Sequence, residues 1–124
     1  MVTQKKIRGD YGEEIAVSYL EDEGYQVLTR NYKTRYGEID IIAMDGKELT
    51  FVEVRTFSKG SYVEPEESVF KRKRRKIINT ARMYITENKT DCGCRFDVIG
   101  ISLRKGGQME IRLIKDAFRI SDRF

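Results

Sequence analysis

Two acidic residues stand inside segments that otherwise have the character of buried β-strands. Asp40 lies within residues 38–42 and Glu53 within residues 51–54, both rich in isoleucine, valine and phenylalanine. Aspartate is a poor strand former, and neither charge is normally tolerated between buried β-branched neighbours. A half-buried pair of repelling acids usually has a cation between its members. The pattern favours a cation site, with two solvent-facing acids on a one-sided antiparallel sheet as the alternative.

The composition narrows the chemistry that such a pair can support. The 124 residues include no histidine, which excludes the usual general base and the Ser/His and Cys/His nucleophile systems. Cys92 and Cys94 are too close together for an ordinary disulfide and are two ligands short of a structural zinc site. Carboxylates remain as ligands, and they favour hard cations such as Mg²⁺ or Mn²⁺.

The bulk properties indicate one domain spanning residues 1–124. Hydrophobic residues make up 40% of the chain, which is too much apolar material for a disordered protein of this size. No apolar run approaches the ~20 residues of a membrane span, and the N-terminal stretch lacks the hydrophobic core of a signal peptide. We therefore expect a cytoplasmic protein that does not engage membranes.

The apolar periodicity predicts an α/β fold with the element order αβββαββ. The first helix should bury Tyr11, Ile15, Ala16, Tyr19 and Leu20, and the second should bury Val69, Phe70, Ile77, Ile78, Ala81, Tyr84 and Ile85. Polar connections are expected at 31–35 and 56–64. Helices are predicted at 11–23 and 65–88, and strands at 25–30, 38–44, 48–55, 95–103 and 109–114.

The second and third strands should form a hairpin that brings the two acids together. Asp45-Gly46 is the dipeptide that best fits a two-residue type I′ turn, which would pair Met44 with Lys47 and place Asp40 opposite Phe51. Strand alternation then puts Asp40, Glu53 and Arg55 on one face, with the acids as diagonal neighbours. Such neighbours have Cβ atoms roughly 7–8 Å apart, which allows two carboxylates to converge on one ion.

A basic block opens the second helix. Lys71, Arg72, Lys73, Arg74, Arg75 and Lys76 form an unbroken run of cations in a chain of net charge +4. Lys73 and Arg74 occupy inward positions of the helix, where apolar residues would be usual. Either their stems cover the edge of the core, or the first turns line a phosphate-binding cleft.

Four aromatic residues lie in polar stretches near the predicted site. Tyr32, Tyr36, Phe57 and Tyr62 could stack on unpaired bases, but packing or loop anchoring is favoured, and no role is assigned to them. Asp97 also has two alternative roles. It could support the sheet or the site, or it could form a structural pair with Arg95.

The ordered motifs resemble the YraN-like bacterial family of unassigned function, which is placed in the restriction-endonuclease-like superfamily and is similar to archaeal Holliday-junction resolvases. The resemblance covers nearly the whole chain. It rests on Gly9-x-x-Gly12-Glu13-x-x-Ala16, Gly24-Tyr25, Arg30-Asn31-Tyr32, Gly37-Glu38-Ile39-Asp40, Phe51-Val52-Glu53-Val54-Arg55, Lys73, Ala81 and Arg95-Phe96-Asp97-Val98.

This resemblance implies a central mixed five-stranded sheet flanked by helices and a Mg²⁺- or Mn²⁺-dependent phosphodiesterase site. Asp40 corresponds to the metal-binding aspartate of the superfamily, and Glu53 with Arg55 occupies its (D/E)-x-K element. Glu13 corresponds to an additional acid near the metal, with a solvated helix residue as the alternative. Lys71, Arg72, Lys73, Arg74 and Arg75 would contact the nucleic acid.

Arg55 departs from the lysine that is usual in the superfamily and leaves the activity open. Arginine cannot serve as a general base at neutral pH, although it can hold a phosphate or an attacking water. The leading hypothesis is a structure-selective or repair-type endonuclease, with DNA favoured over RNA and a homodimer as one expected state. The alternatives are a non-catalytic nucleic-acid-binding module and an adaptor that binds proteins through the basic helix.

Overall fold

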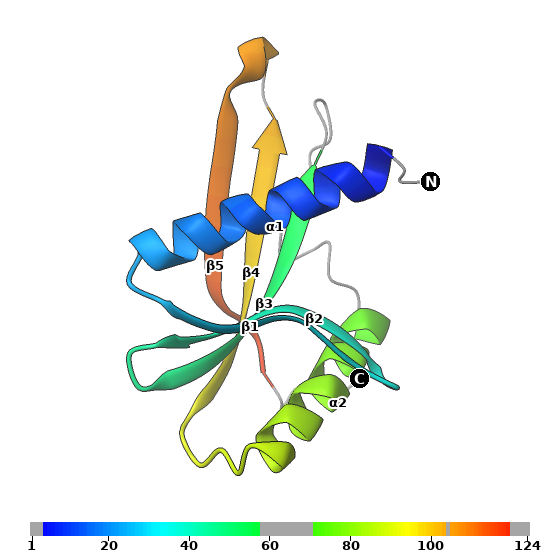
Figure 1. Cartoon of the computed structure of the whole chain (residues 1–124), viewed down its shortest axis with the longest axis vertical. Helices are drawn as coiled ribbons and strands as arrows, with labels where there is room; N and C mark the ends of the chain where they lie inside the picture. Colours follow the sequence, from blue (N-terminus) through cyan, green and yellow to red (C-terminus); the bar gives the residue numbers. More distant parts are fainter. Residues whose placement is uncertain (1–3, 58–70, 104, 120–124) are drawn as a thin grey trace.

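The structure, a computed structural model, describes residues 4–57, 71–103 and 105–119. Its order of helices and strands confirms the predicted αβββαββ arrangement (Figure 1). In chain order the elements are helix α1 (Gln4–Asp22), strands β1 (Gln26–Thr34), β2 (Gly37–Asp45) and β3 (Glu48–Phe57), helix α2 (Lys71–Glu87), strand β4 (Cys94–Leu103), the 3₁₀ helix η2 (Lys105–Gly107) and strand β5 (Met109–Phe118).

The strands form one five-stranded mixed sheet, as predicted, and they lie in the order β1-β2-β3-β4-β5. Strands β3 and β4 are parallel, whereas the pairs β1–β2, β2–β3 and β4–β5 are antiparallel. A parallel pair requires a long crossover connection, and α2 lies in that connection. None of the helices in the described part of the chain is long and apolar enough to cross a membrane.

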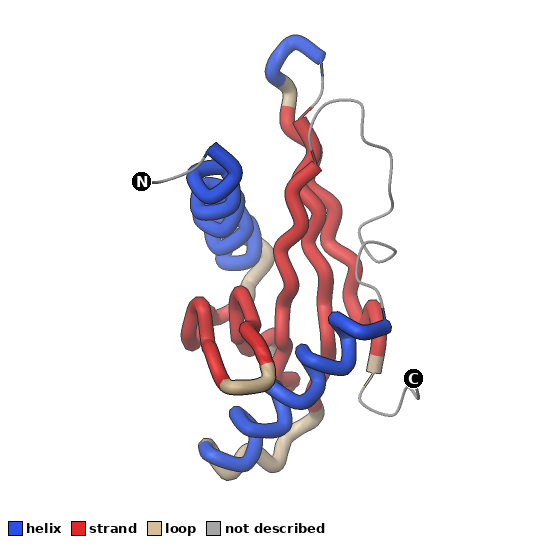
Figure 2. Tube along the Cα trace, turned by 90° about the vertical axis from the view of Figure 1, so that its right-hand side faces the viewer, coloured by secondary structure: helices blue, strands red, loops and turns tan. Residues whose placement is uncertain are grey.

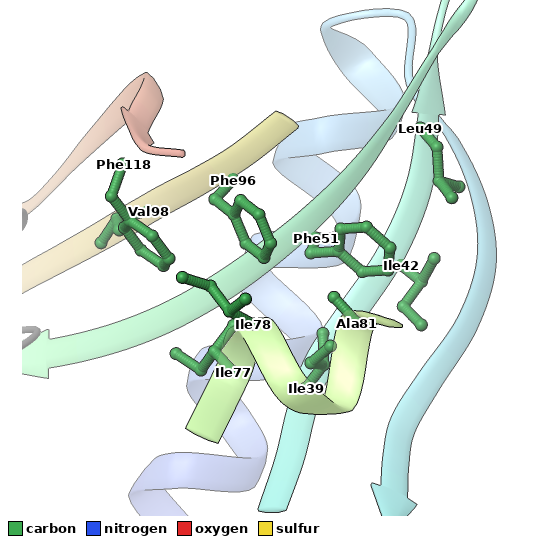
Figure 3. Packing of buried hydrophobic residues seen from close by; sticks show 10 residues of the cluster. All are labelled: Ile39, Ile42, Leu49, Phe51, Ile77, Ile78, Ala81, Phe96, Val98 and Phe118. Carbon is green, nitrogen blue, oxygen red and sulfur yellow. The ribbon is translucent and has the colours of Figure 1, made fainter. Parts of the chain in front are cut away.

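Two apolar layers hold the helices against the sheet. Helix α1 crosses the strands in front of β3, β4 and β5 in the view of Figure 1 and contributes Ala16 and Leu20 to one layer. Helix α2 contributes Ile77, Ile78 and Ala81 to the other layer, where Ile78 and Ala81 lie next to the rings of Phe96 and Phe51 (Figure 3). The first layer also contains Tyr25, Ile41, Ala43, Val52, Ile99 and Ile101, and the second Ile39, Ile42, Leu49, Val98 and Phe118.

Helix α1 begins at Gln4 rather than at Tyr11, and its buried face differs from the predicted one at one position. Ala16 and Leu20 are fully buried, but Tyr11 is 64% exposed. Gly12 takes the inward position instead, because the helix approaches β3 so closely that a Cβ at Gly12 would lie 2.6 Å from the Cγ2 atom of Thr56. A glycine at this point brings the next residue, Glu13, close to the sheet.

The first strand is longer than predicted. Strand β1 runs to Thr34 and includes most of the expected connection at 31–35. Its pairing with β2 shifts between Val27 and Thr29, and Asn31 has a φ angle of 53°. Asparagine is enriched in this left-handed conformation, so the strand tolerates local irregularity without ending. The turn that follows contains Arg35 and Tyr36.

The β2–β3 hairpin forms, but its loop is Gly46-Lys47 rather than Asp45-Gly46. Asp45 pairs with Glu48 and Met44 with Leu49. Gly46 has a φ angle of 61°, and a type II′ turn places a positive φ at its first central residue. The shift moves the partner of every β2 residue by two positions and therefore leaves the faces unchanged. Phe51 consequently lies opposite Ile42 and not opposite Asp40.

The second helix agrees with the prediction over its described length. Ile77, Ile78 and Ala81 are buried, and Tyr84 and Ile85 pack against the same layer. Residues 65–70, including the expected core residues Val69 and Phe70, lie outside the described residues, as do 58–64 of the predicted loop. Thr56 and Phe57 belong to β3 and not to that loop, and β5 extends beyond its predicted end to Phe118.

Candidate functional site

Strands β2 and β3 separate at the predicted site. Their described ladder ends at the pair Ile41 and Val52, and continuing its register by one step places Asp40 opposite Glu53. The Oδ2 atom of Asp40 accepts a hydrogen bond of 2.8 Å from the backbone N–H of Val54. A buried N–H group requires an acceptor, and here a side chain supplies it where strand pairing stops. The Asp40 carboxylate is thereby fixed between the two strands.

Glu53 is buried beside Asp40 and forms an ion pair with a lysine of helix α2. Its side chain is 6% exposed, and its Oε1 atom lies 2.5 Å from the Nζ atom of Lys73 on α2. Burial and, after it, the charge of Glu53 raise the pKa of Asp40 to about 7, while the Val54 hydrogen bond and the charge of Lys73 oppose this shift. The structure therefore brings together two acids that repel each other, with one ammonium group to offset them.

Helix α1 brings a third acid toward this pair. The Glu13 side chain is 16% exposed, whereas that of its neighbour Glu14 is 66% exposed. Burial raises the pKa of Glu13, and the charge of Asp40 adds to this effect, while a hydrogen bond with Asn31 and the charge of Arg30 oppose it. Glu13 is thus not a freely solvated helix residue. We call Glu13, Asp40, Glu53 and Lys73 the fork site.

The basic block divides into inward and outward residues, as predicted. Lys73 and Arg74 are half-buried, whereas Arg75 and Lys76 are exposed. Lys73 enters the fork site through Glu53. The guanidinium group of Arg74 lies 5.2 Å from the ring centroid of Phe118, which fits a stem that covers the core edge. Lys71 and Arg72 belong to α2, but their side chains lie outside the described part of the structure.

Arg55 lies on β3, two residues beyond Glu53, and is half-buried. It pairs in register with Gly100 of β4, so a glycine flanks it on that side of the strand. The sheet places it next in line after Glu53 on the same face. Arg55 thus stands near the fork site, on the part of β3 that extends past the end of the β2 ladder.

The donor set of the fork site suits a hard divalent cation. Mg²⁺ binds through one or two carboxylates and completes its shell with water and substrate phosphate. Asp40 and Glu53 supply two such carboxylates, and their mutual repulsion would fall when a cation is bound. Within the described residues, no three acidic, histidine or cysteine side chains converge into a complete metal cage. Glu13 accordingly belongs to the electrostatic surroundings of Asp40 and is not shown as a direct third ligand.

Sequence reasoning missed two neighbours of the site. Asn31 hydrogen-bonds Glu13, and the charge of Glu38 raises the pKa of both Glu13 and Asp40 after the larger effects of burial. Both residues belong to the motifs that carry the family resemblance, so these motifs were a signal that could have identified them. The contact of Asn31 depends on a left-handed backbone and a strand irregularity that the sequence pattern did not reveal.

A second polar cluster occupies another part of the sheet. Asp97 is fully buried and accepts hydrogen bonds from the side chains of Tyr25 and Arg95 and from the backbone N–H of Asp116. Arg95 also binds Asp45 and Glu48 at 2.7 and 3.0 Å. This assigns Asp97 to structural pairing with Arg95. Lys115 forms a further ion pair with Asp45 at 3.2 Å. We call Tyr25, Asp45, Glu48, Arg95, Asp97 and Lys115 the Arg95 cluster.

Comparison with known proteins places the chain in a family. Residues 12–101 match the family described as "Uncharacterised protein family UPF0102". A UPF0102 protein of Chlorobium chlorochromatii is 44% identical over 115 residues, which cover 89% of each chain. One from Syntrophus aciditrophicus is 40% identical over 97% of this chain and 94% of its own. One from Geobacter metallireducens is 42% identical over 98% and 99%, respectively. The chain therefore belongs to the UPF0102 family, which is the YraN-like family that its motifs resemble.

Proposed function

We propose that this protein is a metal-dependent endonuclease of the restriction-endonuclease-like superfamily, similar to archaeal Holliday-junction resolvases, that hydrolyses phosphodiester bonds in nucleic acid, with DNA favoured over RNA. The observation that carries the proposal is the half-buried Asp40 beside the buried Glu53, where β2 and β3 separate. Burial and the charge of Glu53 hold the pKa of Asp40 at about 7. An acid pair perturbed in this way marks a candidate functional site.

Asp40 and Glu53 would hold a Mg²⁺ or Mn²⁺ ion through their carboxylate oxygens. Such an ion, when bound, lowers the pKa of a water molecule and stabilises negative charge on phosphate oxygens. The Val54 N–H group fixes the orientation of the Asp40 carboxylate, so this ligand is held in place before a cation arrives. Glu13 adds negative charge near Asp40, which favours cations over anions in the site.

The basic side chains of the site act on the phosphate. Lys73 neutralises Glu53 in the absence of other cations, and its 41% exposed side chain can turn from Glu53 to a substrate phosphate. Arg55 supplies a second, permanently charged group for binding phosphate or orienting a water molecule. Neither residue has to accept a proton. The proposed mechanism therefore draws its nucleophile from water in the cation's surroundings and its charge neutralisation from these two residues.

The test is cleavage of labelled branched, single-stranded and duplex DNA with Mg²⁺ or Mn²⁺. Asp40→Asn and Glu53→Gln preserve side-chain shape and remove the charged ligand oxygens. We expect either change to lower the cleavage rate by more than the roughly 10- to 100-fold typical of losing an outer-shell partner. Asp91→Asn, which alters an exposed acid before β4, should retain native activity. Equal activity in Asp40→Asn and the native protein would contradict the proposal.

A second function is favoured by Arg55. The cation at this position cannot be deprotonated, which fits a nucleic-acid-binding module that does not catalyse hydrolysis. In that case the native protein should bind nucleic acid without divalent metal, with an affinity that falls as salt rises, and should cleave none of the substrates. Arg55→Lys separates the two functions, because a gain of cleavage in this variant would show that the remaining machinery is intact.

A further inference from the structure

An open groove lies between the tip of the β1–β2 hairpin and helix α2. In both Figure 1 and Figure 2 the hairpin lies beside α2, and an added Cβ at Gly37 would approach Lys76 and Thr80 to 3.5 Å. The groove has a volume of about 490 Å³. It is lined by Tyr36 from the turn and by Asn79, Arg82, Met83, Thr86 and Glu87 from α2.

Tyr36 presents an exposed and braced aromatic ring to this groove. The residue is 37% exposed, and the Arg35 guanidinium lies 4.9 Å from its ring centroid. The Nη2 atom of Arg35 also donates a hydrogen bond of 2.8 Å to the Tyr36 hydroxyl group. Tyr32 behaves differently, because its ring packs edge-on against Tyr84 at 5.3 Å. Packing explains Tyr32, but it leaves the ring of Tyr36 held in position without a place in either apolar layer.

The charges around the groove are mainly positive. Arg82 lines it, Arg35 covers the Tyr36 ring, and Lys76 lies at the adjoining contact with the hairpin. The acid among the lining residues, Glu87, accepts a hydrogen bond of 2.9 Å from the Tyr32 hydroxyl group. An aromatic face flanked by cations is the combination that binds single-stranded nucleic acid, because bases stack while phosphates meet the charges.

A second groove on α1 provides a contrast. It has a volume of about 360 Å³ and also contains a tyrosine, Tyr19, but its charged lining residues are the acids Glu14 and Asp22. A polyanion would be repelled there. The two grooves therefore share an aromatic residue and differ in the sign of their charge, which makes the α1 groove an internal control.

The α2 groove also lies within reach of the fork site. From Tyr36 to Asp40 the chain spans ~13 Å at the rise of a strand, and from Lys73 to Asn79 ~9 Å at the rise of a helix. Successive nucleotides of one strand in a duplex are spaced by about 3.4 Å, and unstacked strands extend further. A strand with a phosphate at Lys73 can thus place a base at Tyr36 only a few nucleotides away.

We propose that the α2 groove is a stacking site for an unpaired base of the DNA strand whose phosphate occupies the fork site. This inference rests on the proposed function and names its substrate class, which is DNA with a single-stranded or unpaired segment. Tyr36 supplies the stacking face, Arg35 holds the ring, and Arg82 contacts the neighbouring phosphate. These groups distinguish unpaired from paired strands, because a base inside a duplex has no free face.

The experiment measures binding by fluorescence anisotropy in EDTA, where no metal-dependent cleavage occurs, with a labelled single-stranded thymidine oligomer and a blunt duplex of equal length. Loss of one stacked base should weaken single-strand binding by roughly 5- to 150-fold in Tyr36→Ala, because stacking contributes about 1–3 kcal/mol per base. Tyr36→Phe retains the stacking face and should bind like the native protein. Tyr19→Ala is the control for the acidic groove, and circular dichroism verifies the fold of each variant.

The outcomes separate this inference from the proposed function. If the native protein binds the oligomer but Tyr36→Ala binds it equally well, the stacking site is wrong and the proposed function stands. If Tyr36→Ala weakens the duplex as much as the single strand, Tyr36 is a general contact and the stacking site is again wrong. If the native protein binds neither nucleic acid, the stacking site is wrong, and the proposed function is decided separately by the cleavage assay with Mg²⁺ or Mn²⁺. A uridine oligomer in parallel reports whether DNA is preferred to RNA.

Discussion

The fork site and the Arg95 cluster both place acids on the same sheet, but the surroundings of these acids shift their pKa values in opposite directions. In the Arg95 cluster, Asp97 has three kinds of hydrogen-bond donor around it, and the hydrogen bond from Arg95 lowers the pKa of Asp45. In the fork site, burial and the charge of Glu53 raise the pKa of Asp40 to about 7. The charged form of Asp45 is thus favoured in the Arg95 cluster, whereas the charged form of Asp40 is disfavoured in the fork site.

This difference distinguishes the Arg95 cluster, whose ion pairs stabilise the fold, from the fork site, whose acids fit the proposed function. Arg95 sits 12% exposed among Asp45, Glu48 and Asp97, so its guanidinium satisfies several acceptors at once. Lys73 offers a single ammonium group to Glu53, from a side chain that is 41% exposed. A fold that required only stability could replace the fork acids by apolar residues at little expense. Their presence in this arrangement supports the proposed site, which a bound cation would complete.

The largest effect should come from breaking the satisfied cluster. Arg95→Met removes the guanidinium donors to Asp97, leaves only the donors from Tyr25 and Asp116, and deprives a fully buried carboxylate of its cation. Loss of one partner of a buried pair destabilises proteins by about 3–5 kcal/mol, and we expect an effect of this size on the free energy of unfolding in urea. Lys47→Met, a change in the exposed β2–β3 turn, should have almost no effect. A loss below about 1 kcal/mol in Arg95→Met would show that the cluster is not structural.

Removing an acid from the fork site should raise the free energy of unfolding, whereas breaking the Arg95 cluster lowers it. Because the folded-state pKa of Asp40 is raised from 3.8 to about 7, the folded protein binds one more proton than the unfolded chain between these values. The stability of the native protein should therefore fall as the pH rises from about 4 to about 7. Asp40→Asn lacks this loss and should be more stable at pH 8, by up to about 4 kcal/mol for the full shift, and nearly equal at pH 3.5.

Urea titrations of both proteins from pH 3.5 to pH 8 measure this difference. Glu13, Glu38, Glu53 and Lys73 also face the carboxylate, so Asp91→Asn serves as the control for titration elsewhere in the chain. A variant that is less stable than the native protein at pH 8 would mean that Asp40 is stabilised in its charged form. The contrast with the Arg95 cluster would then disappear.

The sequence allowed the fold to be predicted because its signals are local. Isoleucine-rich strands, the hairpin signal of Asp45-Gly46 and the spacing of Ile77, Ile78 and Ala81 predict the elements, although the hairpin loop itself is Gly46-Lys47. The fork itself was not predictable in the same way. It depends on where the β2–β3 ladder stops, which the structure resolves through the Asp40 contact with Val54.

The candidate site was predictable as a set of residue types and only partly as a set of contacts. Strand alternation predicted Asp40 and Glu53 on one face, but regular alternation is broken at Asp40, because Ile39 packs in the layer of α2 and Ile41 in the layer of α1. The Asp40 carboxylate is instead joined to β3 through the backbone N–H of Val54. The pairing of Lys73 with Glu53 joins residues from a strand and a helix, so no short pattern could reveal it. The buried position of Gly12, which brings Glu13 inward, likewise depends on the close approach of a helix to Thr56.

A smaller effect should come from removing the cation of the fork site. Lys73→Met leaves Glu53 buried beside Asp40, and we expect a loss of about 1–2 kcal/mol without metal, less than for Arg95 because Lys73 is 41% exposed. Millimolar Mg²⁺ should then stabilise this variant more than it stabilises the native protein, because the ion replaces the missing charge. Thermal unfolding with Mg²⁺ and with EDTA measures the difference. Equal stabilisation of the two proteins would argue against an ion between the acids.

The smallest effect concerns the α1 side of the fork site, where Glu13 and Glu14 form a matched pair on one helix. Because the folded-state pKa of Glu13 is raised, its ionised form opposes folding, and this opposition should vanish at pH 3.5 where the group is protonated. Glu13→Gln should therefore gain less than about 1 kcal/mol of stability at pH 8 and nothing at pH 3.5, since Arg30 already offsets part of the charge. Glu14→Gln, which removes an exposed partner of Arg30, should show no such gain. If the stability of the two variants depends on pH in the same way, the charge of Glu13 does not interact with that of Asp40. The repulsion between acids is then confined to the residues on the strands and α2.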